Sequence, residues 1–418
     1  MSEVRFPLGP EAISQYRQAR LGLRNYQGDA RRQASRDIQR GRRLLVQDYT
    51  EQILQRALRP AHSTDEALVW FWFNHFNVFW AKDLVGVALP DYVDNVIRPN
   101  VRGRFRDLLL GTMTHPAMLV YLDNARNVKG RINENYAREL LELHTLGVDG
   151  GYTQADVREA ARVLTGLGLR PVRPMQLNRT LPRFQPLVRE RGEFVFDPAR
   201  HESGAKVVLG RRLEGAGFAE VEALVDLLVG HPATARHIAG RLCRYLLGDG
   251  APAATVTRAA AAFAESGGDL ARTVSTIEAA AGTKRGRTFK DPYRYVLSAV
   301  ALLSGEQGVS DARPVARWLS LLGQPLFGCR TPDGYSLDGQ DWVNAGQMTQ
   351  RFELAREMVG VVPRIAAQPV SAEAVLARPA AQALLAGLGP ASRAALARAG
   401  SGEERLALLL ASPEFMYW

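Results

Sequence analysis

The chain has 418 residues, of which 46% are apolar and 23% are charged, and its formal net charge at pH 7 is +10. These proportions are close to those of ordinary globular proteins, which excludes a disordered, collagen-like or coiled-coil chain. The two cysteines, Cys243 and Cys329, are far apart and lack metal-binding spacing, so neither a disulfide framework nor a structural zinc site is predicted.

As written, the chain shows no membrane or export segment. It contains no run of about 18 apolar residues without a charge, and its opening lacks the apolar stretch of a signal peptide. We therefore predict no transmembrane segment and a cytoplasmic location, or a periplasmic or secreted one if a leader has been removed.

The predicted elements are almost all helices, because apolar residues recur at intervals of three and four between short segments of Gly, Pro or Asp. The expected fold class is all-α, with one small β-hairpin in a long central loop. The predicted helices span residues 10–25, 33–57, 64–80, 101–113, 132–146, 153–165, 219–229, 232–247, 252–265, 269–281, 290–304, 312–322, 346–358 and 402–411.

The first 60 residues are strongly basic, with 12 Arg against 6 acidic residues. Such a helix could bind nucleic acid by releasing counterions, but a solvated arginine face is the simpler interpretation, so nucleic acid is an unlikely partner. The densest part of this cluster comprises Arg31, Arg32, Arg36, Arg40, Arg42 and Arg43.

Residues 170–215 depart from the helical pattern, since they contain several prolines and the alternating run that ends in Phe194–Phe196. We predict a crossing loop with a hairpin in which Phe194–Phe196 pairs with Val207–Leu209. The loop, residues 171–215, would separate an N-terminal helical lobe, 1–170, from a C-terminal helical lobe, 216–418, within one compact unit.

The densest polar segment is the predicted helix 132–146. At 100° per residue, one stripe of this helix carries two carboxylates, a guanidinium and an amide. A stripe facing solvent would be ordinary surface, with Arg138 and Glu142 as an i,i+4 pair. In a cleft, the carboxylates could hold a divalent cation or divide acid and base roles. The stripe comprises Asn135, Arg138, Glu139 and Glu142.

Local signals define the end of this helix and the start of the next one. Gly147 suits the position that follows a helix, and Thr153 with Asp156 forms the pattern of a capping box. Further along, the turn-rich segment from Asp333 to Asn344 is predicted to be a surface loop that could close a pocket.

Two histidines have possible chemical roles. His75 lies in an aromatic helix, where a core position is the usual interpretation, and the alternative is a site wall shared with Asn74. His201 lies in the irregular central region near Lys206, a better position for a proton carrier. His231 and His237, near the helix start at Pro232, are expected to be structural or exposed.

Sequence motifs of several common enzyme classes are absent. The chain has no phosphate-binding loop, no dinucleotide-binding glycine motif, no hydrolase nucleophile elbow and no HExxH metal motif. Nucleotide hydrolysis, dinucleotide binding and α/β-hydrolase chemistry are therefore disfavoured.

Several segments resemble the bacterial domain-of-unknown-function 1800 family. The run Asn133 to Leu143, followed by Gly147 and by Tyr152 to Val157, is similar to the family signature, and the likeness continues at His115–Asn124, Trp72–Phe76, His201–Gly210, Trp342–Asn344 and Ser412–Phe415. The resemblance implies a helical fold but no reaction. Relatives are often encoded beside sulfatase-like proteins, which are thus possible partners. His144 stands where members more often carry an aromatic residue such as Phe.

Two hypotheses follow from these observations. The first is a hydrolase with a cleft among the 132–146 helix, the 64–80 helix and the 195–210 hairpin, with a divalent cation as a possible cofactor. The second is a non-catalytic helical scaffold or binding module whose polar groups bond to one another. In the first, the catalytic candidates are Glu139, Glu142, His75 and His201, and the substrate-binding candidates are Asn74, Asn135, Arg138 and Lys206.

Overall fold

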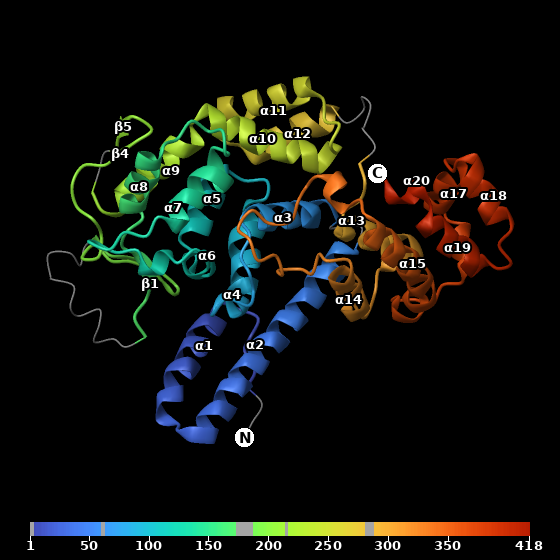
Figure 1. Cartoon of the computed structure of the whole chain (residues 1–418), viewed down its shortest axis with the longest axis horizontal. Helices are drawn as coiled ribbons and strands as arrows, with labels where there is room; N and C mark the ends of the chain where they lie inside the picture. Colours follow the sequence, from blue (N-terminus) through green and yellow to red (C-terminus); the bar gives the residue numbers. More distant parts are fainter. Residues whose placement is uncertain (1–3, 60–62, 173–186, 214–215, 281–287) are drawn as a thin grey trace.

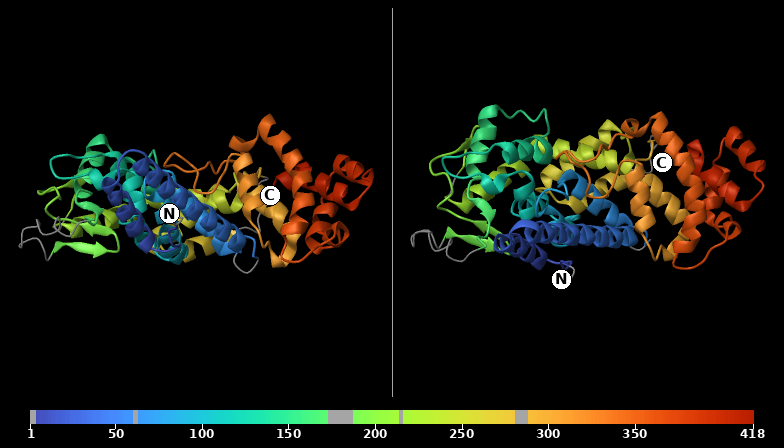
Figure 2. Two further views of the ribbon diagram at one scale, coloured as in Figure 1. Left: turned by 90° about the horizontal axis from the view of Figure 1, so that it is seen from below. Right: turned by 60° about the horizontal axis from the view of Figure 1, so that its bottom comes forward.

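The computed structural model describes residues 4–59, 63–172, 187–213, 216–280 and 288–418. Within these residues the chain is mainly helical, which confirms the predicted fold class. The molecule is elongated, with the short strands near one end and the last helices at the other (Figure 1, Figure 2). No helix in the described ranges is long and apolar enough to cross a membrane.

The N-terminal half is helical up to a group of short strands. Its helices are α1 (Glu11–Gly22), α2 (Gly28–Ala57), α3 (Ser63–His75), α4 (Val85–Tyr92), α5 (Phe105–Met113), α6 (Pro116–Tyr121), α7 (Asn135–Glu139) and α8 (Gln154–Val163). The strands are β1 (Leu167–Leu169), β2 (Arg189–Arg191), β3 (Phe194–Phe196), β4 (Val207–Val208) and β5 (Arg211–Arg212).

Within its described residues, the C-terminal half consists of helices and the loops that connect them. Its helices are α9 (Phe218–Val229), α10 (Pro232–Leu247), α11 (Ala253–Glu265), α12 (Leu270–Ala280), α13 (Pro292–Ser304), α14 (Arg313–Leu321), α15 (Ala345–Ile365), α16 (Ala372–Leu376), α17 (Pro379–Ala386), α18 (Pro390–Ala397), α19 (Gly402–Ala411) and α20 (Pro413–Met416). One cluster of buried apolar side chains runs from α1 to α20, and the division into two lobes stays a prediction.

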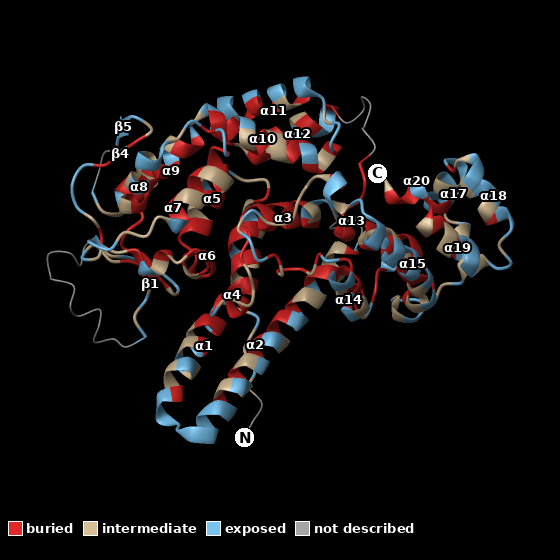
Figure 3. Cartoon of the chain, in the orientation of Figure 1, coloured by how far each residue is buried: buried red, intermediate tan, exposed pale blue. Residues whose placement is uncertain are grey.

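Helices α1 and α2 form a hairpin that projects from the body, and its tip is exposed (Figure 3). The arginines of the predicted cluster are exposed along α2, except for Arg42. Arg42 is buried, donates to the carbonyl oxygens of Ala81 (3.2 Å) and Asp83, and lies over the ring of Trp80. One arginine of the cluster therefore anchors α2 to the body.

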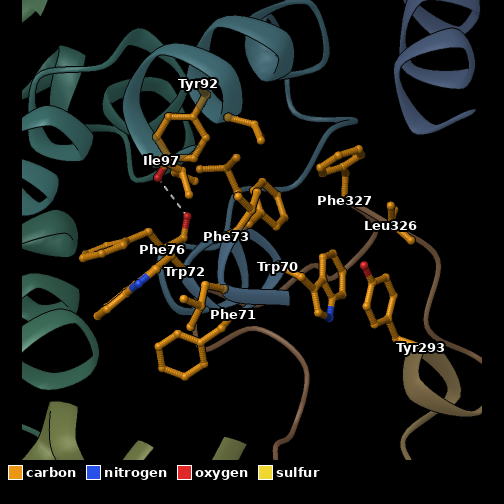
Figure 4. Packing of buried hydrophobic residues seen from close by; sticks show 14 of the residues in the cluster. Trp70, Phe71, Trp72, Phe73, Phe76, Tyr92, Ile97, Tyr293, Leu326 and Phe327 are labelled. Atoms are coloured by element: carbon orange, nitrogen blue, oxygen red, sulfur yellow. Dashed lines mark hydrogen bonds between the residues drawn. The ribbon is translucent and has the colours of Figure 1, made fainter. Parts of the chain in front are cut away.

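Helix α3 forms the centre of the core. Trp70 stacks on Tyr293, with ring centroids 4.8 Å apart, and Phe73 meets the edge of Phe327 at the same distance (Figure 4). Apolar contacts around all sides are typical of a core helix. The helix ends at His75 and not near residue 80, and the carbonyl oxygen of Phe76 accepts a hydrogen bond from Tyr92.

Helix α4 was not predicted. Every residue from Val85 to Leu89 is buried, so the segment lacks the amphipathic pattern of a surface helix. It also contains Pro90, a residue that usually interrupts a helix. Tertiary packing outweighs these local signals.

The predicted pairing of the hairpin is wrong. Strand β3 is buried and pairs with β1 on one side and β2 on the other, whereas β4 pairs with β5. Leu209 and Gly210 have φ values of 50° and 72°, as a tight two-residue turn requires. Leu209 therefore lies in the turn between β4 and β5, not in a strand.

A closed polar network fastens this strand region to α9. Lys206 is 1% exposed, and its ammonium group donates to the Glu220 carboxylate and to the carbonyl oxygen of Glu202 (2.7 Å). His201 donates through Nδ1 to the carbonyl oxygen of Thr165 (2.7 Å), and its Nε2 lies 3.3 Å from Glu220. A buried ammonium group requires such partners.

The predicted helix 132–146 is divided between two helical geometries. Helix α7 covers only Asn135–Glu139, and a π-helix, η6 (Leu140–Thr145), follows it. The amide of Leu146 donates to the carbonyl oxygen of Leu141, five residues earlier, at 2.8 Å. This wider geometry changes the directions of the side chains beyond Glu139 relative to a regular α-helix.

His144, on η6, occupies an aromatic environment in the core. It is fully buried, its ring centroid lies 5.1 Å from that of Phe76, and neither ring nitrogen has a hydrogen-bond partner among the described residues. Burial lowers the pKa of His144 from 6.5 to about 3. The side chain is therefore neutral at ordinary pH and packs like an aromatic residue.

We predict that His144→Phe raises the free energy of unfolding at pH 7 by about 1 kcal/mol, because an unsatisfied buried polar group is removed. Between pH 3 and 6.5 the unfolded state binds a proton at His144 that the folded state does not, so stability falls as pH falls through this range. Urea unfolding measured at pH 7 and at pH 4 should show a smaller loss of stability for the variant than for the wild-type protein. A less stable variant at pH 7 would contradict the prediction.

We also predict that Glu220→Gln lowers the free energy of unfolding by about 3 kcal/mol, because it leaves the Lys206 charge buried without its counterion. Urea unfolding at pH 7 measures the change. Glu222→Gln on the same helix is the control and should change stability by less than about 0.5 kcal/mol. Equal effects of the two substitutions would show that the ion pair is not the cause.

Candidate functional site

A polar pocket of about 680 Å³ lies between α10 and the loop 333–341. Helix α10 contributes three arginines and a histidine, and the loop contributes two aspartates and a tyrosine. Its side chains with ionisable groups are Arg236, His237, Arg241, Arg244, Asp249, Asp333, Tyr335 and Asp341. The structure thus confirms that the segment after Asp333 closes a pocket.

The side chain of Asn74 holds this loop against α3. Its amide nitrogen donates to the carbonyl oxygen of Tyr335 (2.8 Å), and its amide oxygen accepts from the Tyr335 backbone amide (2.7 Å). Gly334 has a φ of 76°, and a Cβ atom there would lie 2.2 Å from the carbonyl oxygen of Asn74. Asn74, a predicted substrate-binding residue, is therefore occupied in positioning the wall of the pocket.

Helix α10 begins as predicted, with Pro232 in its first turn and the His231 ring accepting from the amide of Ala233 (3.2 Å). Its apolar residues, such as Ile238 and Leu242, are buried in the core. Because α-helical residues three and four apart share a face, His237, Arg241 and Arg244 follow one another along the side that lines the pocket.

The three arginines of α10 that line the pocket have no side-chain hydrogen bond or ion pair within the described part of the chain. The Nε atom of Arg241 is buried and has no partner among those residues. Burial and the nearby positive charge of Arg244 lower the pKa of Arg241 to about 10, while the charge of Asp333 opposes this shift. The sequence interpretation missed these residues, although their spacing on a predicted helix was visible.

Neither Glu139 nor Glu142 lines this pocket, but the charge of Asp333, which does line it, acts on Glu139. The Glu139 carboxyl is partly buried and accepts no hydrogen bond from the described residues. Burial raises its pKa, the negative charges of Glu142 and Asp333 raise it further, and the positive charge of Arg138 opposes this shift. Glu142 accepts a hydrogen bond from the Tyr152 hydroxyl (2.8 Å), which keeps it beside Glu139.

Asp333 connects the two groups of charges. It lines the pocket, its charge favours the protonated form of Arg241, and the same charge raises the pKa of Glu139. Its carboxylate has no hydrogen-bond donor among the residues that the structure describes. The sequence interpretation placed Asp333 in a turn and gave it no chemical role.

The other half of the predicted stripe has structural partners. Asn135 donates to the carbonyl oxygen of Leu122 (3.1 Å). Arg138 pairs with Glu134 (3.4 Å) and donates to the Gln154 side chain (2.8 Å), so its i,i+4 partner is Glu134 and not Glu142. The stripe does not act as a unit, and within it the charge of Asp333 acts on Glu139.

His75 lies in the core behind the pocket. It is 1% exposed, its Nε2 donates to the carbonyl oxygen of His144 (3.2 Å), and its Nδ1 has no partner among the described residues. Burial lowers its pKa well below the ordinary value. Its ring centroid lies 6.0 Å from that of His237, which does line the pocket. His75 is thus neutral and separated from the pocket by a second imidazole.

His201 and Lys206 are brought together, but in the network with Glu220 and not beside Glu139. Their side chains contact Thr165, Glu202, Gly204 and Glu220. No described interaction joins them to Glu139, Glu142 or the pocket.

Metal ligation is a separate question from proton transfer. Across the described ranges, no three His, Cys, Asp or Glu side chains are arranged to hold a metal ion together. The described residues therefore provide no group of three ligands for the divalent cation that the sequence suggested at Glu139 and Glu142.

Comparison with known proteins gives a family but no activity. No curated protein matches the chain, and no solved structure does. A family model described as "Protein of unknown function (DUF1800)" matches residues 8–417, nearly the whole chain. The signature that begins at Asn133, the carboxylates of α7 and η6 and the loop after Asp333 all lie within this match, and the chain belongs to the DUF1800 family.

Proposed function

We propose that this protein is a hydrolase whose active site lies at Asp333, through which the pocket between α10 and the loop 333–341 is linked to Glu139. The observation that carries the proposal is the placement of Glu139. Its carboxyl group has no hydrogen-bond partner in the described part of the chain, and its pKa is raised by burial and by Glu142 and Asp333. A carboxyl group that keeps its proton closer to neutral pH is suited to general acid catalysis.

The proposed reaction divides the proton transfers between two carboxyl groups. Asp333 accepts a proton from water, and the oxygen of that water forms a bond to the electrophilic atom of an ester. The bond from this atom to the leaving oxygen breaks, and Glu139 donates its proton to that oxygen. Transfer of the proton from Asp333 to Glu139 restores both groups.

Glu142 acts in this proposal as a positioning residue. Its carboxylate is held by the Tyr152 hydroxyl, and its negative charge contributes to the raised pKa of Glu139. The hydrogen bond and burial also raise the pKa of Tyr152 to about 12, so the tyrosine remains a hydrogen-bond donor at neutral pH.

The scaffold hypothesis has support at other residues. Asn74, His201 and Lys206 bond to protein groups, as a scaffold requires. The same hypothesis also expects that the polar groups leave no cavity, whereas the arginines and Asp333 surround a pocket of about 680 Å³. This pocket, with its unpartnered charges, favours the hydrolase.

We predict that Glu139→Gln lowers kcat by about 100-fold or more for esters with a poor leaving group, because the general acid is lost. The loss should be much smaller for p-nitrophenyl esters, whose leaving oxygen needs little protonation. The measurement compares phenyl with p-nitrophenyl acetate, and phenyl with p-nitrophenyl phosphate. Wild-type activity on phenyl esters should also fall as pH rises through the raised pKa of Glu139.

The control is Glu134→Gln, because Glu134 is on the same segment but bonds to Arg138 and Gln154. This variant should keep the wild-type rates. An equal loss for both leaving groups in Glu139→Gln would contradict the general-acid role, and hydrolysis of none of the four esters by the wild-type protein would contradict the hydrolase.

A further inference from the structure

We infer that the arginine face of α10 binds an oxyanion, such as a carboxylate, phosphate or sulfate group, at one end of the ligand. The face carries Arg241 and Arg244, and Arg236 lines the pocket beside it. The identification of this ligand as a substrate rests on the proposed function. The inference that an oxyanion binds here is independent of it. The inference starts from the absence of partners for these three side chains.

Some arginines elsewhere in the described structure have carboxylate partners. Arg98 binds both Glu66 and Asp94 (3.0 Å), and Arg294 binds Asp291 (2.6 Å). The three arginines of α10 have no such contact among the described residues, although acidic side chains line the same pocket. Arg236 and Arg244 are exposed, whereas Arg241 is partly buried, so Arg241 carries the argument for a bound anion.

Two of the three acidic side chains that line the pocket accept hydrogen bonds from the loop. Asp249 accepts a hydrogen bond from the amide of Gly339 (3.1 Å), and Asp341 accepts one from the Ser336 hydroxyl. Asp333 alone among them has no donor within the described ranges. Asp333 is therefore the acidic group of the pocket that is left without a donor, and its charge acts on both Arg241 and Glu139.

Arg241 provides the strongest reason for a bound anion. Its Nε is buried without a partner among the described residues, and an unsatisfied buried donor costs free energy. A guanidinium group presents N–H donors in a planar fork that matches the oxygens of a carboxylate, phosphate or sulfate. An oxyanion at this position would satisfy the buried donor and compensate the positive charges of Arg241 and Arg244.

The dimensions of the pocket suggest an organic ligand larger than a free ion. A volume of about 680 Å³ is in the range of small-molecule sites. Arg241 and Arg244 are about one helical turn apart, so one oxyanion could contact both. With its oxyanion on the arginine side, the rest of the ligand would extend toward Asp333 and Glu139, where the proposed hydrolysis occurs.

The test measures binding of inorganic phosphate, sulfate and acetate by titration calorimetry at constant ionic strength, with chloride as the reference anion. At least one of the three should bind the wild-type protein. Arg241→Gln and Arg244→Gln should each weaken binding by about tenfold or more, since each removes a charge-assisted hydrogen bond. Asp333→Asn should tighten binding, because it removes a negative charge that repels the anion.

The control is Arg258→Gln, which removes an exposed arginine of α11 that does not line this pocket. It should bind the anion as the wild-type protein does. No binding of any of the three anions, or binding that the α10 substitutions do not weaken, would overturn the inference, as would an equal loss in Arg258→Gln.

Glu139→Gln separates this inference from the proposed function. It should retain anion binding while it loses general acid catalysis. Anion binding that depends on Arg241, in a protein that hydrolyses none of the four esters, would leave the anion site established and contradict the hydrolase. Hydrolysis that depends on Glu139, in a protein that binds none of the three anions, would support the hydrolase and contradict the anion site.

Discussion

The two hydrogen bonds between the Asn74 side chain and the backbone of Tyr335 hold together the parts of the chain that form the pocket. Asn74 can act in this way because α3 is packed on all sides and cannot shift easily. The missing side chain of Gly334 allows the loop to approach it. The position of Asp333, between α10 and the carboxylates of α7 and η6, follows from this contact.

Polar groups in this molecule fall into two kinds. In the network of His201, Lys206 and Glu220, the buried charges bond to protein partners. Glu139 and Arg241, by contrast, are partly buried and have no such partners among the described residues. Burial raises the pKa of Glu139 and lowers that of Arg241, so it favours the neutral form of each. Unsatisfied buried groups cost stability, so their concentration around one cavity is more consistent with a binding site than with a structural network.

The sequence predicted most helices, because periodicity and end signals are local. The capping box of Thr153 and Asp156 is present, and Gly147 has the positive φ expected after a helix. Helix α4 was missed because a segment buried on all sides has no polar face. The hairpin pairing was wrong because Leu209, an ordinary strand residue, occupies a turn that is more often formed by Asn and Gly.

By itself, the sequence determined the helical fold, several of the helix ends and the family, and it directed attention to Glu139 and Glu142. Only the tertiary structure decided which polar groups meet. Helical periodicity describes one regular helix, whereas the π-helix η6 redirects side chains. Asp333 acts on both Glu139 and Arg241, which are far from it in the chain, only because the fold brings these segments together. Burial, which sets the protonation of these groups, is likewise a property of the packed structure and not of any single segment.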